Sequence, residues 1–223
     1  MQMTPTSHSV LTLLNAHQSD AVLANMAPRY GIHTTSAIGV SMADMKDIAR
    51  QVGMDHDLAL ELWATGIYEA RTVAALIDVP ASVTAKQMDA WCRDFDNWAI
   101  CDTVCFNLFD RSKPAWTMVD RWAARTKKFE KRAAFALLWS LALHDKVADD
   151  ERFVHGLELI EREAVDDRNF VTKAIAMALR AVGRRNPVLT AAAIDTAGRM
   201  LDAPDPSARR IGRTALREMA ATA

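Results

Sequence analysis

Trp98 and Asp102 stand four residues apart in the middle of the chain. On a helix, residues at this spacing are neighbours on one face. The face of an indole ring attracts cations, and a carboxylate can stabilise positive charge or position a water molecule. The pair therefore fits a reaction that passes through a cationic intermediate.

The same segment also has a purely structural interpretation. An amphipathic helix would place an apolar stripe in the core, with Asp102 at its edge paired to a base; that stripe is Trp98, Cys101, Cys105 and Leu108. The three cysteines, Cys101 and Cys105 on this stripe and Cys92 nearby, match no zinc spacing and have no histidine close by as a fourth ligand. We expect buried free thiols and neither a metal nor a cofactor.

Basic residues gather in the second half of the chain. Residues 1–110 hold 6 Lys and Arg against 13 Asp and Glu, whereas residues 111–223 hold 21 against 15, for a net charge of −1. Aligned bases could follow a phosphate backbone. Pairing with nearby acids is the alternative, and both interpretations stay open. The bases concerned are Arg121, Arg125, Lys127, Lys128, Lys131, Arg132, Lys173, Arg180, Arg184, Arg185, Arg209, Arg210, Arg213 and Arg217.

Apolar residues recur at helical spacing along most of the chain, and no stretch alternates strictly, so we predict an all-α protein. Four look-alike segments carry a base before an Ala-rich helix, and aligning these bases gives steps of 61, 41 and 40 residues. The long step leaves room for a further unit around 98–109. HEAT-type helix pairs repeat every roughly 40–47 residues and stack into a solenoid, which is the architecture we expect. The aligned bases are Arg71, Arg132, Lys173 and Arg213.

Local signals place the helix ends, and none of them marks a flexible linker. Gly183 to Pro187 reads as a stop, and Pro204 and Pro206 bracket a turn before the last helix. We therefore treat residues 1–223 as one repeat domain, with about the first ten residues mobile.

Composition limits the class of protein and the compartment in which we expect it. Half of the 223 residues are hydrophobic and a quarter are charged, which is typical of a globular protein. No apolar run approaches the roughly 20 residues that a membrane span needs, and the start lacks a secretory signal. An odd count of three cysteines favours a reducing compartment. We expect a cytoplasmic monomer without a membrane anchor.

Several separated segments, in order, resemble the DNA alkylation repair proteins, the AlkD-like DNA glycosylases built from HEAT-like repeats. The resemblance runs from about Met26 to Met219. It is carried by MAPRYGIHTTSAIGVSMADMKDIAR, LALELWATGIYEARTVAALI, DFDNWAICDTVCFNLF, KRAAFALLWSLALHDK, FVTKAIAMALRAVGRRNP and ARRIGRTALREM. It implies an all-α solenoid that binds duplex DNA in a basic groove. Catalytic members excise cationic N3- and N7-alkylpurines, working from the deoxyribose side without a base pocket.

The resemblance also assigns roles. Asp102 would stabilise the oxocarbenium-like sugar and position water, Trp98 would pack against that sugar, and Arg132 would hold a phosphate beside the lesion. Active relatives carry a second Trp where this chain has Met177, and Arg180 follows one turn later. A thioether packs against a sugar but lacks a π-face, so the departure bears on catalysis more than on DNA binding.

Three hypotheses follow. The first is a hydrolase, an alkylpurine-DNA glycosylase that uses Asp102 and Trp98. The second is a non-catalytic HEAT-repeat protein that recognises distorted or branched DNA. In both, Arg132, Met177, Arg180, Lys173 and Arg213 would contact duplex DNA. The third is a scaffold for a protein partner.

Overall fold

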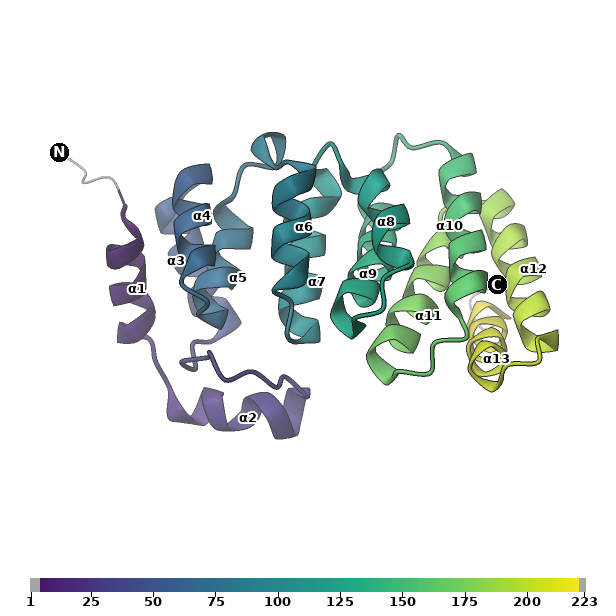
Figure 1. Cartoon of the computed structure of the whole chain (residues 1–223), viewed down its shortest axis with the longest axis horizontal. Coiled ribbons are helices and arrows are strands. Elements are labelled where there is room, and N and C mark those ends of the chain that lie inside the picture. Colours follow the sequence, from purple (N-terminus) through teal and green to yellow (C-terminus); the bar gives the residue numbers. More distant parts are fainter. Residues whose placement is uncertain (1–4, 221–223) are drawn as a thin grey trace. The chain divides into compact units, whose positions relative to one another are not determined.

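The computed structural model describes residues 5–220, which form α-helices and two short 3-10 turns joined by loops (Figure 1). The predicted all-α fold is confirmed, and the architecture is that of HEAT-like helical repeats. Residues 1–4, where part of the expected mobile start falls, lie outside the described residues, and the first helix begins at Ser7. Within residues 5–220, no helix is both long enough and apolar enough to cross a bilayer.

The chain forms two compact units, residues 1–113 and 114–223. The first unit contains α1 (Ser7–Ala16), α2 (Asp20–Tyr30), α3 (Met42–Val52), α4 (His56–Ala64), α5 (Tyr68–Ile77), η1 (Pro80–Ser82), α6 (Ala85–Arg93), α7 (Trp98–Asn107) and η2 (Phe109–Arg111). The second contains α8 (Ala115–Ala123), α9 (Lys128–His144), α10 (Asp150–Glu163), α11 (Asn169–Gly183), α12 (Pro187–Asp202) and α13 (Pro206–Ala220). A single domain over 1–223 stays a prediction.

In the first unit, α4 packs on α5 and α5 packs on α7, so successive helix pairs share a core. An aromatic cluster fills part of it: Trp63 and Trp91 stack at 3.9 Å between ring centroids, with Phe95 and Phe109 against them. The helix α2 runs crosswise to α3, α5 and α7 (Figure 1). Residues of α2 line both cavities described below.

In the second unit, three helix pairs stack as two layers. Helices α9, α11 and α13 form one layer, and α8, α10 and α12 form the other (Figure 1). The turn predicted from Gly183 to Pro187 is confirmed, since α11 ends at Gly183 and α12 begins at Pro187 with Asn186 as its N-cap. The helix α7, Trp98–Asn107, fills the unit that the long repeat step left open.

Small residues set the spacing between α12 and α13. A Cβ on Gly212 of α13 would lie 2.5 Å from the carbonyl oxygen of Ala197 on α12, and 3.0 Å from the backbone nitrogen of Leu201. No side chain can be added there without moving one helix away from the other. The absence of a side chain at Gly212 is therefore a packing requirement of this pair.

We expect Gly212→Ala to lower the free energy of unfolding by about 1–3 kcal/mol, the usual range for overpacking. The matched control is Gly198→Ala on α12, where an added Cβ meets nothing within 4 Å. Because Gly is a poor helix former, that control should stabilise by roughly 0.5–1 kcal/mol. Urea unfolding monitored by circular dichroism measures both, and equal effects at the two positions would contradict the packing argument.

Candidate functional site

The helix α7 presents Trp98 and Asp102 to the same cavity. Asn97 caps this helix, and its Oδ1 accepts the N–H groups of Ala99 at 3.0 Å and Ile100 at 3.1 Å. Trp98 is therefore the first helical residue and Asp102 lies one turn further. Both side chains are half-buried and line a cavity of about 650 Å³. The neighbourhood expected from their spacing exists, and their catalytic roles stay predictions.

The opposite side of this cavity is α2. The indole Nε1–H of Trp98 donates to the carbonyl oxygen of Tyr30 at 3.0 Å, at the last residue of α2. Gly31 then ends the helix in the left-handed conformation, with φ of 63°. This hydrogen bond fixes the indole plane and also holds the end of α2 to α7.

The segment between α2 and α3 is fastened by a buried carboxylate. Glu69 of α5 is fully buried and accepts the backbone N–H groups of Ile38, Gly39 and Val40, the shortest at 2.8 Å from Gly39. Gly39 has a φ of 86°, and a Cβ there would meet the carbonyl oxygen of Ser19 at 2.5 Å. From α5, Glu69 thereby positions Val40, which lines the cavity.

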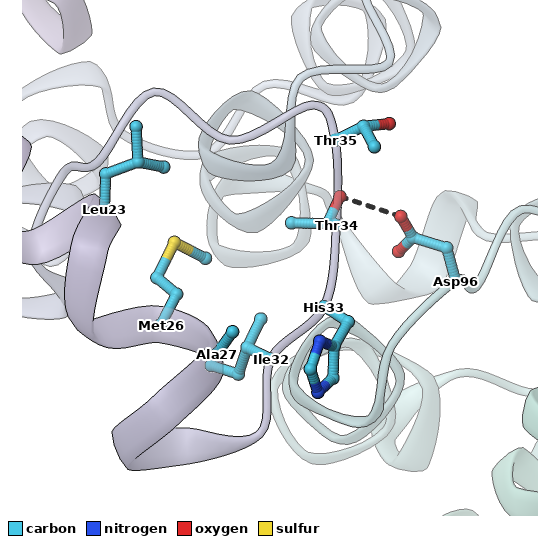
Figure 2. Close-up of a pocket in the computed structure, with 8 residues that line it drawn as sticks. All are labelled: Leu23, Met26, Ala27, Ile32, His33, Thr34, Thr35 and Asp96. Carbon is cyan, nitrogen blue, oxygen red and sulfur yellow. Dashed lines mark hydrogen bonds between the residues drawn. The ribbon is translucent and has the colours of Figure 1, made fainter.

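A second, smaller cavity of about 460 Å³ adjoins the first, and the two share Met26 and Ile32. Figure 2 shows the Thr34 hydroxyl donating to Asp96, at 2.8 Å. Asp96 lies in the loop that leads into α7, so this bond ties the 31–41 segment to the start of the helix that carries Trp98.

Tyr68 contributes a phenol to the larger cavity. Burial first, and the negative charge of Glu69 second, raise its pKa to about 12. The phenol therefore stays protonated at neutral pH and can serve as a hydrogen-bond donor, not as a base.

The cysteines are structural, as the sequence indicates. Cys92, Cys101 and Cys105 are free and fully buried, and burial, with the neighbouring Cys101, raises the pKa of the Cys105 thiol well above its usual value. Leu108 is buried with them, whereas Trp98 departs from the predicted stripe to line the cavity. Within the part of the chain that the structure describes, no group of three or more His, Cys, Asp or Glu side chains could hold a metal ion.

Arg132, the predicted phosphate contact, lies in the second unit and is only 3% exposed. Its Nη1 donates to the carbonyl oxygen of Phe170 at 2.6 Å, which joins α9 to α11. The sequence motif gave no sign of this bond, because the partner is a backbone atom 38 residues away. Phosphate binding by Arg132 stays a prediction.

The other predicted DNA contacts lie on α11 and α13. Lys173 and Arg213 are exposed, while Met177 and Arg180 are half-buried. The Nε of Arg180 donates to the carbonyl oxygen of Ala176 at 3.2 Å, and its guanidinium pairs with Glu218 of α13. Among residues 5–220, neither Lys173 nor Arg213 has an ion-pair partner.

Pairing with acids holds for some of these bases, and the phosphate interpretation stays a prediction. Pairing prevails between α9 and its neighbours, where Arg125 lies 2.8 Å from Glu130 and Lys131 lies 2.5 Å from Glu163. On α13, by contrast, an exposed stripe runs along one face with steps of three and four residues: Arg210, Arg213 and Arg217.

Comparison with known proteins agrees with this architecture. Residues 10–220 match the family described as DNA alkylation repair enzyme. A solved structure aligns with a TM-score of 0.75 at 22% identity, over 87% of this chain and 83% of its own; it is described as a new family of proteins related to the HEAT-like repeat DNA glycosylases with affinity for branched DNA structures. The curated proteins contain no match. The repeat fold and the match over nearly the whole chain show that this protein belongs to the DNA alkylation repair enzyme family.

Proposed function

We propose that the protein is a DNA glycosylase that hydrolyses the N-glycosidic bond of cationic N3- or N7-alkylpurines in duplex DNA. The observation that carries the proposal is that Trp98 and Asp102 line one cavity in a chain of the DNA alkylation repair enzyme family. The proposed reaction uses water as the nucleophile and assigns no role to a metal or a cofactor. A monomer acting in the cytoplasm would suffice.

This reaction needs a carboxylate that stabilises positive charge more than it needs a general acid. An alkylated purine already carries positive charge, so it leaves with little protonation, and the deoxyribose develops oxocarbenium character. The Asp102 carboxylate would stabilise this charge and orient the attacking water. The indole of Trp98, held by the Tyr30 carbonyl, would pack against the sugar with a fixed plane.

The phosphate contacts are assigned to exposed bases. Arg132 is buried and its Nη1 donates to the Phe170 carbonyl, so a direct phosphate contact would require this side chain to move toward the surface. Lys173 and Arg213 are exposed and need no such rearrangement, so they would make the direct phosphate contacts. Arg132 would instead hold α9 to α11.

The test is release of free base from methylated duplex DNA, together with duplex binding measured on the same preparation. Release of 7-methylguanine or 3-methyladenine supports the glycosylase. A folded protein that binds duplex DNA without releasing base would replace the glycosylase with a binding function. Neither release nor binding would leave a protein-partner scaffold.

A second candidate is a DNA-binding protein without base excision, which recognises distorted or branched DNA. Met177 favours it, because this half-buried residue lies on α11 one turn from Lys173 and offers a thioether where active relatives offer an aromatic ring. The two candidates share the DNA surface and differ in turnover.

For either candidate, we expect the charge reversals Lys173→Glu and Arg213→Glu together to weaken duplex affinity about tenfold or more. Each lost phosphate contact should reduce by about 1 the magnitude of the slope of the logarithm of the association constant against the logarithm of the salt concentration. The matched control is Lys86→Glu with Lys146→Glu, two exposed bases outside the predicted contacts, with the same change in net charge. Fluorescence anisotropy at several salt concentrations measures both pairs, and equal losses would remove the α11–α13 surface from the proposal.

A further inference from the structure

We propose that a cavity in the second unit binds the phosphate group of a small molecule. This cavity has a volume of about 330 Å³ and lies where α9 and α11 end and α10 and α12 begin. Its volume is at the lower end of the roughly 300–1,000 Å³ that small-molecule sites occupy. It shares no residue with the cavity beside Trp98 or with the predicted DNA contacts, so the inference goes beyond the proposed glycosylase.

Three cationic side chains line this cavity: Lys146, Arg184 and Arg185. Lys146 and Arg184 are exposed, and among residues 5–220 neither side chain forms an ion pair or a hydrogen bond. The acid among the lining residues is Asp150, and its two oxygens accept from the Asn186 amide at 3.0 and 3.1 Å. Three cations against one carboxylate leave the walls with a net charge of +2.

The acids of the loop between α9 and α10 are engaged elsewhere. Asp145 accepts two backbone N–H groups of its own loop and the indole N–H of Trp116. Asp149 caps α10 and lies 3.7 Å from Arg152. Neither carboxylate pairs with Lys146, so the positive charge of the cavity stays available to an anion.

Arg185 is held in a fixed position at the wall of the cavity. Its Nη1 donates to the carbonyl oxygen of Ala142 at 2.8 Å, and its guanidinium lies over the Phe153 ring, 3.8 Å from the centroid. Its Nε is buried and has no hydrogen-bond partner within the part of the chain that the structure describes. A buried cationic donor without a partner is unfavourable, and an anion beside it offsets that cost. A guanidinium fixed in this way also loses little side-chain entropy when it binds a phosphate.

The exposed bases are not needed to cap α11. The carbonyl oxygens of Ala181 and Val182 accept the backbone N–H groups of the two residues that follow the helix. The carbonyl oxygen of Gly183 accepts the Thr190 hydroxyl at 2.7 Å. Because these carbonyl groups already have donors, the Arg184 side chain lines the cavity without a capping role.

The charges around the cavity favour a compact dianion over a nucleic-acid backbone. Asp149 and Glu151, the sequence neighbours of Asp150, are exposed and would repel the further phosphates of a polymer. A phosphomonoester carries a charge of about −1.5 to −2 at pH 7, which balances the charge of the walls. Arginine and lysine are the side chains that proteins use to bind phosphate. Inorganic phosphate and an organic phosphomonoester share this chemistry.

The experiment titrates three probes into the intact chain by calorimetry: inorganic phosphate, deoxyadenosine 5′-monophosphate and deoxyadenosine. The first variant combines Lys146→Gln with Arg184→Gln, two exposed positions whose loss should leave the fold intact. Its matched control combines Lys86→Gln with Lys113→Gln, two exposed bases that do not line this cavity. The second variant, Asp150→Asn, removes the negative charge of the wall and keeps an oxygen that can accept the Asn186 amide.

We expect both phosphate probes to bind wild type and deoxyadenosine not to bind. The Lys146 and Arg184 double variant should bind phosphate at least tenfold more weakly, whereas its control should stay within twofold of wild type. Asp150→Asn should bind several-fold more tightly, because it changes the wall charge in the opposite direction. Tighter binding of the monophosphate than of inorganic phosphate would identify an organic phosphate as the ligand, and the reverse order would identify inorganic phosphate.

Absence of phosphate binding to wild type would overturn the assignment, as would equal weakening in the double variant and its control. Displacement of bound phosphate by duplex DNA would replace the small molecule with a nucleic acid. Base release from methylated duplex DNA, measured in parallel, should be the same in the double variant as in wild type. The phosphate site and the glycosylase can therefore fail independently of each other.

Discussion

Replacing Asp102 by asparagine is expected to lower base release from methylated duplex DNA about 100- to 1,000-fold, the range seen when one electrostatic contact to a developing charge is removed. The amide keeps the shape of the carboxylate but not its charge, so it no longer stabilises the cationic sugar. Duplex affinity should stay within a factor of about two, since the substitution removes a negative charge rather than a phosphate contact. Single-turnover base release beside anisotropy titration separates the two effects.

The matched control is Asp96→Asn, a carboxylate six residues earlier that lines the neighbouring cavity and accepts from Thr34. Asp96 also accepts from the Asn97 amide through its other oxygen, and an asparagine keeps one of the two acceptors. Its base release should therefore stay within a few-fold of wild type. An Asp102→Asn protein as active as wild type would rule out the proposed mechanism. Equal losses at Asp96 and Asp102 would point to damage of the local fold.

Glu69→Ala is expected to reduce the free energy of unfolding by about 3 kcal/mol or more. The substitution removes the acceptor of the buried N–H groups of Gly39 and Val40 and of the half-buried N–H of Ile38. Each loss of a buried partner costs about 1–3 kcal/mol before the loop relaxes. Urea denaturation monitored by circular dichroism measures the change in the intact chain.

Two further variants test whether the loss of stability is specific to the Glu69 carboxylate. Glu61→Ala removes an exposed carboxylate from α4 and should change stability by less than about 0.5 kcal/mol. Glu69→Gln keeps one carbonyl acceptor but turns an NH₂ group toward the same donors, so it should fall between wild type and Glu69→Ala. A loss at Glu69→Ala no larger than at Glu61→Ala would show that the loop does not depend on this carboxylate.

The helices could be predicted because their signals are local. Helical spacing of apolar residues and the Gly183 to Pro187 turn depend on neighbours in sequence, whereas the 40-residue steps depend on repetition along the chain. The structure has helices and a turn where these signals predicted them. The gap in the repeat series likewise predicted a helix near residue 98, where α7 begins. Local patterns fix elements of this kind before any tertiary contact is known.

The site could be predicted only in part because its remaining contacts are distant in sequence. Trp98 and Asp102 are one helical turn apart, so the sequence alone predicted that they lie on the same face of the helix. The crossing of α2, by contrast, depends on the Trp98–Tyr30 bond over 68 residues and on Glu69 reaching the 38–40 backbone. The buried Arg132 donates to a backbone carbonyl that any residue type would supply. No side-chain pattern encodes such contacts.

Three arginines of the second unit each hydrogen-bond a backbone carbonyl about one repeat away. Arg132 reaches Phe170 over 38 residues, Arg168 reaches Thr126 over 42, and Arg185 reaches Ala142 over 43. In a one-dimensional Ising description these bonds belong to the nearest-neighbour coupling, not to the intrinsic stability of a repeat. Weakening them should therefore broaden the unfolding transition as well as shift its midpoint, because cooperativity along the array is what the coupling supplies.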